Sequence, residues 1–185
     1  MDIFKIVFTG GPCAGKTTQI NMVKKYLEDK GYTVMCVSET ATDLYNLGLK
    51  YKFINNQIDF QTLVLKAQSF KENLLDENIQ NKSEKIVVLY DRGILDNKAY
   101  FDNLRDFDYI LKQSNLKEIN ILDNYDLVID LVSLAACDPK KYEIDSNDAR
   151  TETVDYAKKL DERTSNVWAG HHNFSIFNSN TSIKE

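Results

Sequence analysis

A short glycine-rich stretch has residue types and spacing that could hold phosphate groups. Residues 9–18 read TGGPCAGKTT and fit the pattern G-x-x-x-x-G-K-[ST]. In such a loop, glycines permit a tight backbone path, and inward N–H groups surround an anion. Lys16 is expected to reach the β- and γ-phosphates, and the Thr17 hydroxyl is expected to ligate Mg²⁺. The expected phosphate site consists of Gly10, Gly11, Pro12, Cys13, Ala14, Gly15, Lys16, Thr17 and Thr18.

The elements on either side of this loop are the ones that the pattern requires. Residues 3–8 form a nearly continuous apolar run, which is typical of a buried parallel strand. After the loop, Ile20, Val23 and Leu27 recur at helical spacing, and Gly31 follows as a stop signal. A helix that begins at Lys16 directs the positive end of its dipole at the loop. This context favours a phosphate site over a chance glycine-rich turn.

The rest of the chain alternates between strands and helices. Strands are predicted at 3–8, 33–38, 86–90, 127–133 and 174–177. Helices are predicted near 16–30, 41–50, 58–80, 94–104, 106–114 and 148–168. The alternation favours an α/β fold, a three-layer α/β/α sandwich with a parallel five-stranded sheet. Ligands in such sheets bind beyond the carboxyl ends of the strands, so the chemistry is expected there.

Charged residues follow the second and third predicted strands. Glu39 could accept a proton from an acceptor hydroxyl or hold Mg²⁺ through water, and an exposed loop carboxylate is the alternative. Asp91 ends an apolar strand, as an Mg²⁺ anchor should. Arg92 can place a planar fork of donors on a phosphate or on the substrate, and an ordinary loop ion pair is the alternative. Asp130, inside the fourth strand, is interpreted as a hydrogen-bonded strand residue.

The polar segment near the C-terminus has the character of a mobile lid. Residues at about 140–166 contain Arg150 and Arg163, two of the four arginines of the chain. Closure of such a lid would bring these arginines to the phosphates. An ordinary amphipathic surface helix is the alternative. Asn178 follows the last strand and is a candidate contact for the nucleotide base.

The helix at 58–80 carries an apolar stripe beside a polar one. The apolar stripe consists of Phe60, Leu63, Val64, Ala67, Phe70 and Leu74. The second stripe consists of Gln61, Leu65, Gln68 and Glu72. Gln68 and Glu72 are weak candidates for reading the polar edge of an acceptor, and Gln61 is interpreted as a solvated residue.

Composition and charge narrow the class of protein. The 185 residues favour one domain, and 23 basic against 28 acidic residues give a net charge of −5. That charge argues against a general nucleic-acid surface. The chain begins directly with a strand, without a signal peptide, and no apolar run has the length of a membrane span. Its three cysteines lack metal-ligand spacing and are expected to be reduced. A soluble, cytoplasmic protein is expected, and the sequence indicates no oligomeric state.

Several motifs together resemble a known family. GGPCAGKTT, SETAT, YDRGILDNKAY, YDLVIDLVSLA, ARTETVDYAKKLDER and a final IFN resemble the AAA-type ATPase/kinase family that includes the ribosylnicotinamide kinase domain of the bacterial NAD regulator. The likeness extends from residue 3 to about residue 180, and deoxynucleoside and thymidylate kinases are similar more distantly. Members are expected to continue into a further helix beyond Glu185.

This resemblance implies a P-loop NTPase fold of the nucleoside-kinase-like type and a role for each matching residue. Lys16 and Thr17 would take the nucleotide phosphates and Mg²⁺. Glu39 and Asp91 match the family's carboxylates at the strand ends. Arg92 matches the arginine of its DR motif, and Arg150 matches the arginine of its R-T-E stretch.

The leading hypothesis is an ATP- and Mg²⁺-dependent kinase for the hydroxyl of a small, nucleoside-like molecule. Positioning and charge neutralisation supply most of the catalysis of phosphoryl transfer. One alternative is an ATP-binding switch or ATPase that acts through a protein partner. Another is a polynucleotide 5′-hydroxyl kinase, which the net charge of −5 disfavours. The preference for ATP over GTP, and the choice of Glu39 or Asp91 as base, stay open at this point.

Overall fold

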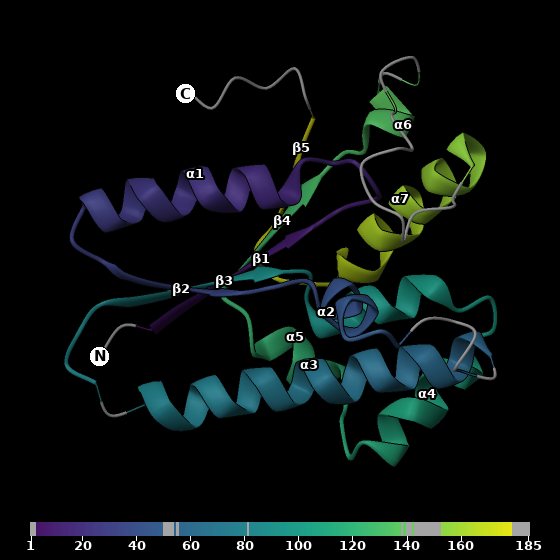
Figure 1. The fold of residues 1–185 in the computed structure, drawn as a ribbon, viewed down its shortest axis with the longest axis horizontal. Helices are drawn as coiled ribbons and strands as arrows, with labels where there is room; N and C mark the ends of the chain where they lie inside the picture. Colours follow the sequence, from purple (N-terminus) through teal and green to yellow (C-terminus); the bar gives the residue numbers. More distant parts are fainter. Residues whose placement is uncertain are drawn as a thin grey trace.

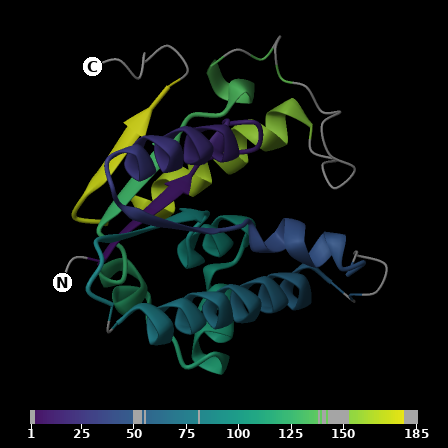
Figure 2. The same cartoon turned by 60° about the vertical axis from the view of Figure 1, so that its left-hand side comes forward.

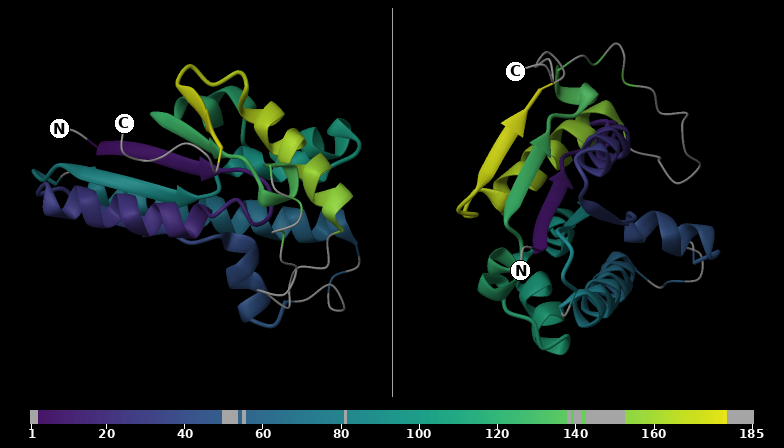
Figure 3. Two further views of the ribbon diagram at one scale, coloured as in Figure 1. Left: turned by 90° about the horizontal axis from the view of Figure 1, so that it is seen from above. Right: turned by 90° about the vertical axis from the view of Figure 1, so that its left-hand side faces the viewer.

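Five parallel strands form one sheet at the centre of the molecule. The computed structural model describes residues 3–49, 54, 56–80, 82–137, 139, 142 and 153–178. The strands are β1 (Ile3–Thr9), β2 (Thr33–Val37), β3 (Ile86–Asp91), β4 (Leu127–Leu131) and β5 (Phe174–Phe177). Their order is β2-β3-β1-β4-β5, and every neighbouring pair is parallel. Figure 3 shows β1, β4 and β5 side by side with their arrowheads in one direction. The predicted parallel five-stranded sheet is confirmed.

Helices lie on both faces of this sheet. They are α1 (Lys16–Asp29), α2 (Thr40–Asn46), α3 (Gln57–Ile79), the 3₁₀ helix η2 (Ile94–Tyr100), α4 (Leu104–Gln113), α5 (Glu118–Asp123), α6 (Leu134–Cys137) and α7 (Val154–Trp168). In Figure 1, α1 lies above the sheet, and α3, α4 and α5 lie below it. Figure 2 shows the same layers after rotation. The predicted three-layer α/β/α arrangement is therefore confirmed. Within the described ranges, no helix combines the length and the apolar character that crossing a bilayer requires.

Apolar side chains on the two faces of the sheet form two cores. Successive residues of a strand point to opposite faces, so a strand covered on both sides is apolar throughout. The core on the α1 side contains Ile6, Phe8, Ile20, Val87 and Leu89. The larger core on the other side includes Val7, Leu65, Val88, Tyr90, Leu95 and Trp168. Because Trp168 ends α7, this core also anchors α7 against the sheet.

The largest departure from the predicted helices follows β3. Residues 94–104 were expected to form one helix, but η2 ends at Tyr100, Phe101 is extended, and α4 starts at Leu104. Buried side chains explain the tight first turn, because Asn97 Nδ2 donates to the Ile94 carbonyl at 2.9 Å and Asp96 accepts from the Gly93 N–H at 2.8 Å. Such local bonds compete with a regular α-helix. The short helices α5 and α6 were not predicted, and the predicted residues 148–152 lie outside the described ranges.

Gly93 lies against the indole of Trp168, and this close approach makes a first prediction. A Cβ added at Gly93 would lie 2.6 Å from Trp168 Cζ2 and 3.1 Å from Val7 Cγ2. Gly93→Ala should therefore lower the free energy of unfolding by about 1–3 kcal/mol, because rigid core groups must shift. Urea unfolding followed by circular dichroism measures this change.

Gly170→Ala is the matched control, because a Cβ there would meet no heavy atom of the described residues within 4 Å. Its effect should stay within about 0.5 kcal/mol. Equal losses of stability in the two variants would show that the contact between Gly93 and Trp168 is not tight.

Candidate functional site

The loop between β1 and α1 has the conformation of an anion cradle. Gly10, Cys13 and Gly15 all have positive φ, at 125°, 55° and 79°. Gly10 is required at its position, because a Cβ there would lie 2.1 Å from the Leu131 carbonyl oxygen. Left-handed turns of this kind direct successive N–H groups into a concavity, and α1 begins at the end of the loop. The strand, loop and helix order that the pattern requires is present.

Lys16 bends back over this loop. Its side chain is 7% exposed, and Nζ donates to the carbonyl oxygens of Gly10 at 3.1 Å and Gly11 at 2.9 Å. Burial and the positive charge of Arg92 lower the pKa of Lys16 to about 8, against the attraction of Glu39, Asp91 and Asp96. A phosphate in the loop would favour the charged ammonium, so the lysine is suited to an anion at this place.

Two of the three predicted metal residues, Thr17 and Asp91, meet at the carboxyl end of β3. Thr17 Oγ1 donates to Asp91 Oδ2 at 2.8 Å. Asp91 is buried, and its second oxygen, Oδ1, has no hydrogen-bond partner among the described residues. Burial raises the pKa of Asp91, against the attraction of Lys16. A divalent cation would favour the ionised carboxylate, and hard oxygen ligands are those that Mg²⁺ prefers, so these residues fit the ion.

Thr17 and Asp91 are not accompanied by a cluster of further metal-binding side chains among the described residues. Across the part of the chain that the structure describes, no three His, Cys, Asp or Glu side chains form a metal-binding group. Mg²⁺ at phosphate-transfer sites is commonly held by one or two carboxylates together with water and substrate phosphates. Thr17 and Asp91 therefore resemble the protein ligands of such an Mg²⁺ site.

Glu39 forms an ion pair with Arg92. Glu39 Oε1 accepts from Arg92 Nε at 2.7 Å, and Oε2 accepts from the Thr42 hydroxyl at 2.6 Å. Burial raises the pKa of Glu39, but Arg92, Lys16 and the Thr42 bond outweigh it and hold this pKa at about 2. Glu39 is therefore not the exposed loop carboxylate that was the alternative interpretation. A carboxylate with so low a pKa is a weak base. Its hydrogen bond from Arg92 Nε instead suits it to hold the guanidinium in place.

Arg92 lies at the centre of the site. Its φ is 74°, and its Nη1 donates to the Gly10 carbonyl at 3.1 Å and to Asp96 Oδ1 at 3.2 Å. Burial lowers the pKa of this guanidinium, but Tyr100, Glu39 and Asp96 more than offset burial, so the pKa is well above its usual value. A left-handed non-glycine residue costs about 1–2 kcal/mol, and such strain concentrates at functional sites.

Asp96 is a site residue that the sequence analysis missed. Its buried carboxylate accepts four hydrogen bonds: from Thr9 Oγ1 at 2.5 Å, Gly93 N at 2.8 Å, Arg92 Nη1 at 3.2 Å and Trp168 Nε1 at 3.2 Å. It thus joins the end of β1, Arg92, η2 and α7. The only signal in the sequence was its position four residues after Arg92, a spacing that pairs opposite charges on a helix.

Asp161 connects α7 to the phosphate loop, and the sequence analysis missed it as well. Its Oδ1 accepts from the N–H groups of Gly11 at 2.7 Å and Ser133 at 3.0 Å. Burial raises its pKa, against those two bonds. Asp130 beside it is buried, and burial raises its pKa to about 6, against a hydrogen bond from Ser165. Its interpretation as a hydrogen-bonded strand residue fits this placement.

The polar stripe of α3 is buried, whereas the apolar stripe is buried only in part, at Phe60 and Val64. Gln61, Gln68 and Glu72 are 4%, 3% and 2% exposed, whereas Phe70 and Leu74 are 67% and 51% exposed. The prediction that Gln61 is solvated is wrong. The polar stripe is buried because it faces polar groups of the segment after β3, and Gln68 Nε2 donates to the Arg92 carbonyl at 2.9 Å.

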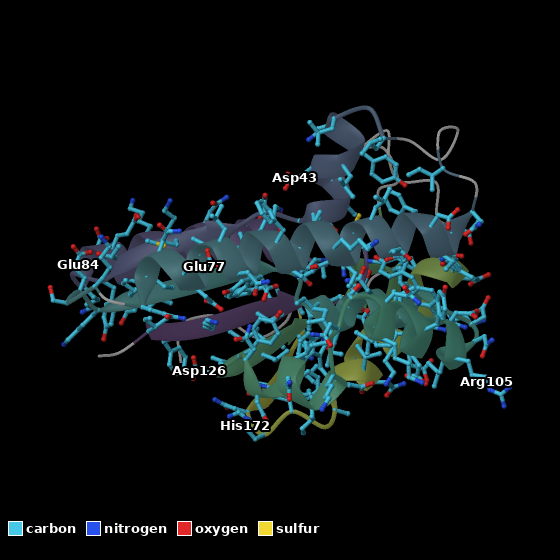
Figure 4. The ribbon with its side chains drawn as sticks, turned by 90° about the horizontal axis from the view of Figure 1, so that it is seen from below. Asp43, Glu77, Glu84, Arg105, Asp126 and His172 are labelled. Carbon is cyan, nitrogen blue, oxygen red and sulfur yellow. The ribbon has the colours of Figure 1, made fainter. Side chains whose placement is uncertain are left out.

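Lys71, also on α3, holds the segment that carries Glu39. Its Nζ donates to the Ser38 carbonyl at 2.9 Å, to Thr40 Oγ1 at 3.1 Å and to Asp43 Oδ2 at 2.6 Å. Asp43 is labelled in Figure 4. The lysine was not a predicted site residue, and the SETAT motif after β2 was the only hint that this segment needs a partner.

The predicted lid and base contacts are placed only in part. Arg150 and most of residues 140–152 lie outside the described residues. Arg163 on α7 pairs with Asp102 Oδ1 at 2.6 Å. Asn178 directly follows β5, which is separated from β1 by β4. The roles of Arg150 and Asn178 in nucleotide binding therefore stay predictions.

The ion pair of Glu39 with Arg92 makes a second prediction, about acid stability. The folded-state pKa of Glu39 is about 2, below its ordinary value of 4.5, so the pair stabilises the fold above pH 4.5 and loses its effect as pH falls toward 2. Glu39→Gln should therefore destabilise the protein at neutral pH by on the order of 3 kcal/mol. The difference from wild type should shrink with acidification.

Urea unfolding at neutral and acidic pH measures both effects. Glu28→Gln is the control, because Glu28 is a 47% exposed residue whose Lys24 partner lies 3.8 Å away. A difference between wild type and Glu39→Gln that did not change with pH would show that Glu39 is not paired as described.

Two comparisons with known proteins agree with this geometry. A family model described as an AAA domain matches residues 5–185. The chain is also 26% identical over 160 residues to a protein of Caldicellulosiruptor saccharolyticus named thymidylate kinase, with 84% of this chain and 78% of that protein covered.

Proposed function

This chain belongs to the AAA domain family, and we propose that it is an ATP- and Mg²⁺-dependent kinase for the hydroxyl of a small, nucleoside-like molecule. The observation that carries the proposal is the bond of Thr17 with Asp91, whose buried Oδ1 has no partner among the described residues, directly beside Lys16 and Arg92. The similarity to a protein named thymidylate kinase supports the reaction class.

Each residue of the site has a role in this proposal. The loop of residues 10–18 holds the nucleotide phosphates, and Lys16 moves from the loop carbonyls to the phosphate oxygens. Thr17 and Asp91 hold Mg²⁺, and Glu39 contributes through water. When bound, Mg²⁺ neutralises negative charge on the phosphate oxygens. Arg150, supplied by the lid, is proposed to stabilise the charge that develops during transfer.

The acceptor is proposed to bind between Glu39, Arg92 and α3. The guanidinium of Arg92 is fixed by Glu39, Asp96 and the Gly10 carbonyl, so it can orient an acceptor with little loss of conformational freedom. On α3, Gln61 is a buried amide and a candidate for hydrogen-bonding a polar edge of the acceptor. Gln68 and Glu72 are bonded to Arg92 and Tyr125, which makes them supports of this surface.

A nucleotide-dependent switch is the second candidate, and one observation favours it. Asp161 bonds α7 to the Gly11 N–H in the phosphate loop and to the Ser133 N–H after β4. A change at the loop on nucleotide binding would thus reach α7 directly. In a switch, α7 would move with the nucleotide state without any transfer to a small molecule.

ADP release from Mg·ATP distinguishes these candidates. Wild type and Lys16→Ala are offered nucleosides, ribosylnicotinamide, other small alcohols and a 5′-hydroxyl oligonucleotide. Strong stimulation by one small compound, absent in Lys16→Ala, is expected for the proposed kinase. Tight ATP binding without stimulation across the panel would favour the switch, and stimulation by the oligonucleotide alone would favour a polynucleotide kinase.

A further inference from the structure

A buried carboxylate on α3, one of the supports of the proposed acceptor surface, is surrounded by hydrogen-bond donors. Glu72 is 2% exposed, and both of its oxygens accept from the Tyr125 hydroxyl at 2.9 Å. Gln68 Nε2 donates to Oε1 at 3.2 Å, and Asn124 Nδ2 donates to Oε2 at 3.4 Å. Three donors converge on the carboxylate, so the ionised form satisfies all of them.

Two of these donors connect Glu72 to the turn that carries Arg92. The Gln68 amide that donates to Glu72 also donates to the Arg92 carbonyl at 2.9 Å. The Tyr125 hydroxyl accepts from the N–H of Ile94 at 3.1 Å. Glu72 therefore holds the turn of residues 92–94 at both ends, through one amide and one hydroxyl.

This turn needs such support, because its backbone is strained. Arg92 has a φ of 74°, which a residue with a side chain rarely adopts. Its N–H donates to the Phe8 carbonyl at 3.0 Å, so β1 fixes one side of the residue and Gln68 fixes the other. Strained residues persist only where the surrounding structure over-determines them.

From this geometry we infer that Glu72 is a positioning residue, which through Gln68 and Tyr125 holds Arg92 against the phosphate loop and releases it when its carboxylate is protonated. A protonated carboxyl must donate its own hydrogen, so at least one of the three neighbours that donate to it has to become an acceptor or lose its contact. The consequence for turnover rests on the proposed function, whereas the effect on Arg92 does not.

The surroundings of Glu72 place the protonation of its carboxylate near neutral pH. Burial raises the pKa of Glu72 to about 7, against the hydrogen bonds of Tyr125 and Gln68 and the charge of Lys5, with Asp76 adding to the rise. The titratable or charged groups that face Glu72 are Lys5 on β1, Asp76 on α3, Tyr90 on β3 and Tyr125 before β4. Those that face Arg92 are Lys16, Glu39, Asp91, Asp96, Tyr100 and Asp161.

The side-chain Nε–Hε resonance of Arg92 tests the inference without any need for activity. It is assigned by its loss in Arg92→Lys and followed by ¹⁵N NMR from about pH 5.5 to about 8.5. In wild type it should shift with a midpoint near the Glu72 pKa of about 7. In Glu72→Gln that transition should disappear, and only a change from Lys16, whose pKa is about 8, should remain.

Matched variants keep this test decisive. Glu77→Gln changes an exposed carboxylate on the same helix (Figure 4) and should keep the wild-type transition. Gln68→Ala cuts the amide link while Glu72 and the Tyr125 link stay, so it should reduce the size of the transition, and it replaces Glu72→Gln if that variant does not fold. A transition near pH 7 that kept its wild-type size in a folded Glu72→Gln or Gln68→Ala protein, or that was absent from wild type, would overturn the inference.

A second readout connects the inference to turnover. The kcat for Mg·ATP turnover should fall on the acid side of neutrality in wild type but not in Glu72→Gln, while the KM for ATP stays similar in both. Absence of turnover in wild type would count against the proposed function, and the NMR result would still decide the role of Glu72.

Discussion

Replacing Lys16 with alanine should lower turnover of Mg·ATP by about 10²- to 10³-fold, the usual cost of removing one preorganised donor from a developing negative charge. The ammonium of Lys16 is 7% exposed and lies 2.9–3.1 Å from two carbonyl oxygens of the phosphate loop. Those carbonyls are weaker partners for a cation than phosphate oxygens are, so the lysine is free to change partner when a nucleotide binds.

Steady-state ADP release and ATP binding by calorimetry would measure the loss in Lys16→Ala. Lys24→Ala is the control, because Lys24 is on the same helix with a 40% exposed side chain. It should turn over like wild type. Full turnover by Lys16→Ala would mean that the loop of residues 10–18 does not hold the reacting phosphates.

Asp91→Asn should have an effect of similar size, about 10²- to 10³-fold on turnover, together with a higher Mg²⁺ requirement. The asparagine oxygen can still accept from Thr17, so the local fold should persist. The variant removes the negative charge of the Asp91 carboxylate, whose buried Oδ1 has no hydrogen-bond partner among the described residues. Glu39→Gln should leave the Mg²⁺ requirement closer to that of wild type, because Glu39 is bonded to Arg92.

The Mg²⁺ dependence of ADP release separates these roles. Asp108→Asn on α4 is the control, since Asp108 is exposed. Asp91→Asn with the Mg²⁺ dependence of wild type would remove Asp91 from the metal site. If the Mg²⁺ dependence changed more in Glu39→Gln than in Asp91→Asn, then Glu39 and not Asp91 would be the main metal-binding carboxylate.

The sheet and the phosphate loop could be predicted from the sequence because their signals are local. Parallel strands between two helical layers are apolar runs, and the glycine pattern fixes the backbone path of the loop. The contact of Thr17 with Asp91 could also be anticipated, because the carboxyl ends of parallel strands meet at one edge of the sheet.

The polar groups that hold Arg92 in place could not be predicted in the same way. The apolar stripe that the sequence shows on α3 includes Phe70 and Leu74, but these two side chains are 67% and 51% exposed. Gln68 and Glu72 are buried together with their hydrogen-bond partners, Arg92 and Tyr125. These partners come from distant parts of the chain, so the spacing of residues along α3 could not reveal them. Asp96 and Asp161 were missed for the same reason, since a buried carboxylate is stable only with donors that the fold brings to it.

The destination of the γ-phosphoryl group tests the central claim most directly. The compound that best stimulates ADP release is incubated with the protein and Mg·ATP, and the products are followed by ³¹P NMR and mass spectrometry. The account predicts that phosphorylated acceptor and ADP appear in equal amounts, and that neither forms with Lys16→Ala. Release of the γ-phosphoryl group only as inorganic phosphate, with the acceptor unchanged, would contradict it.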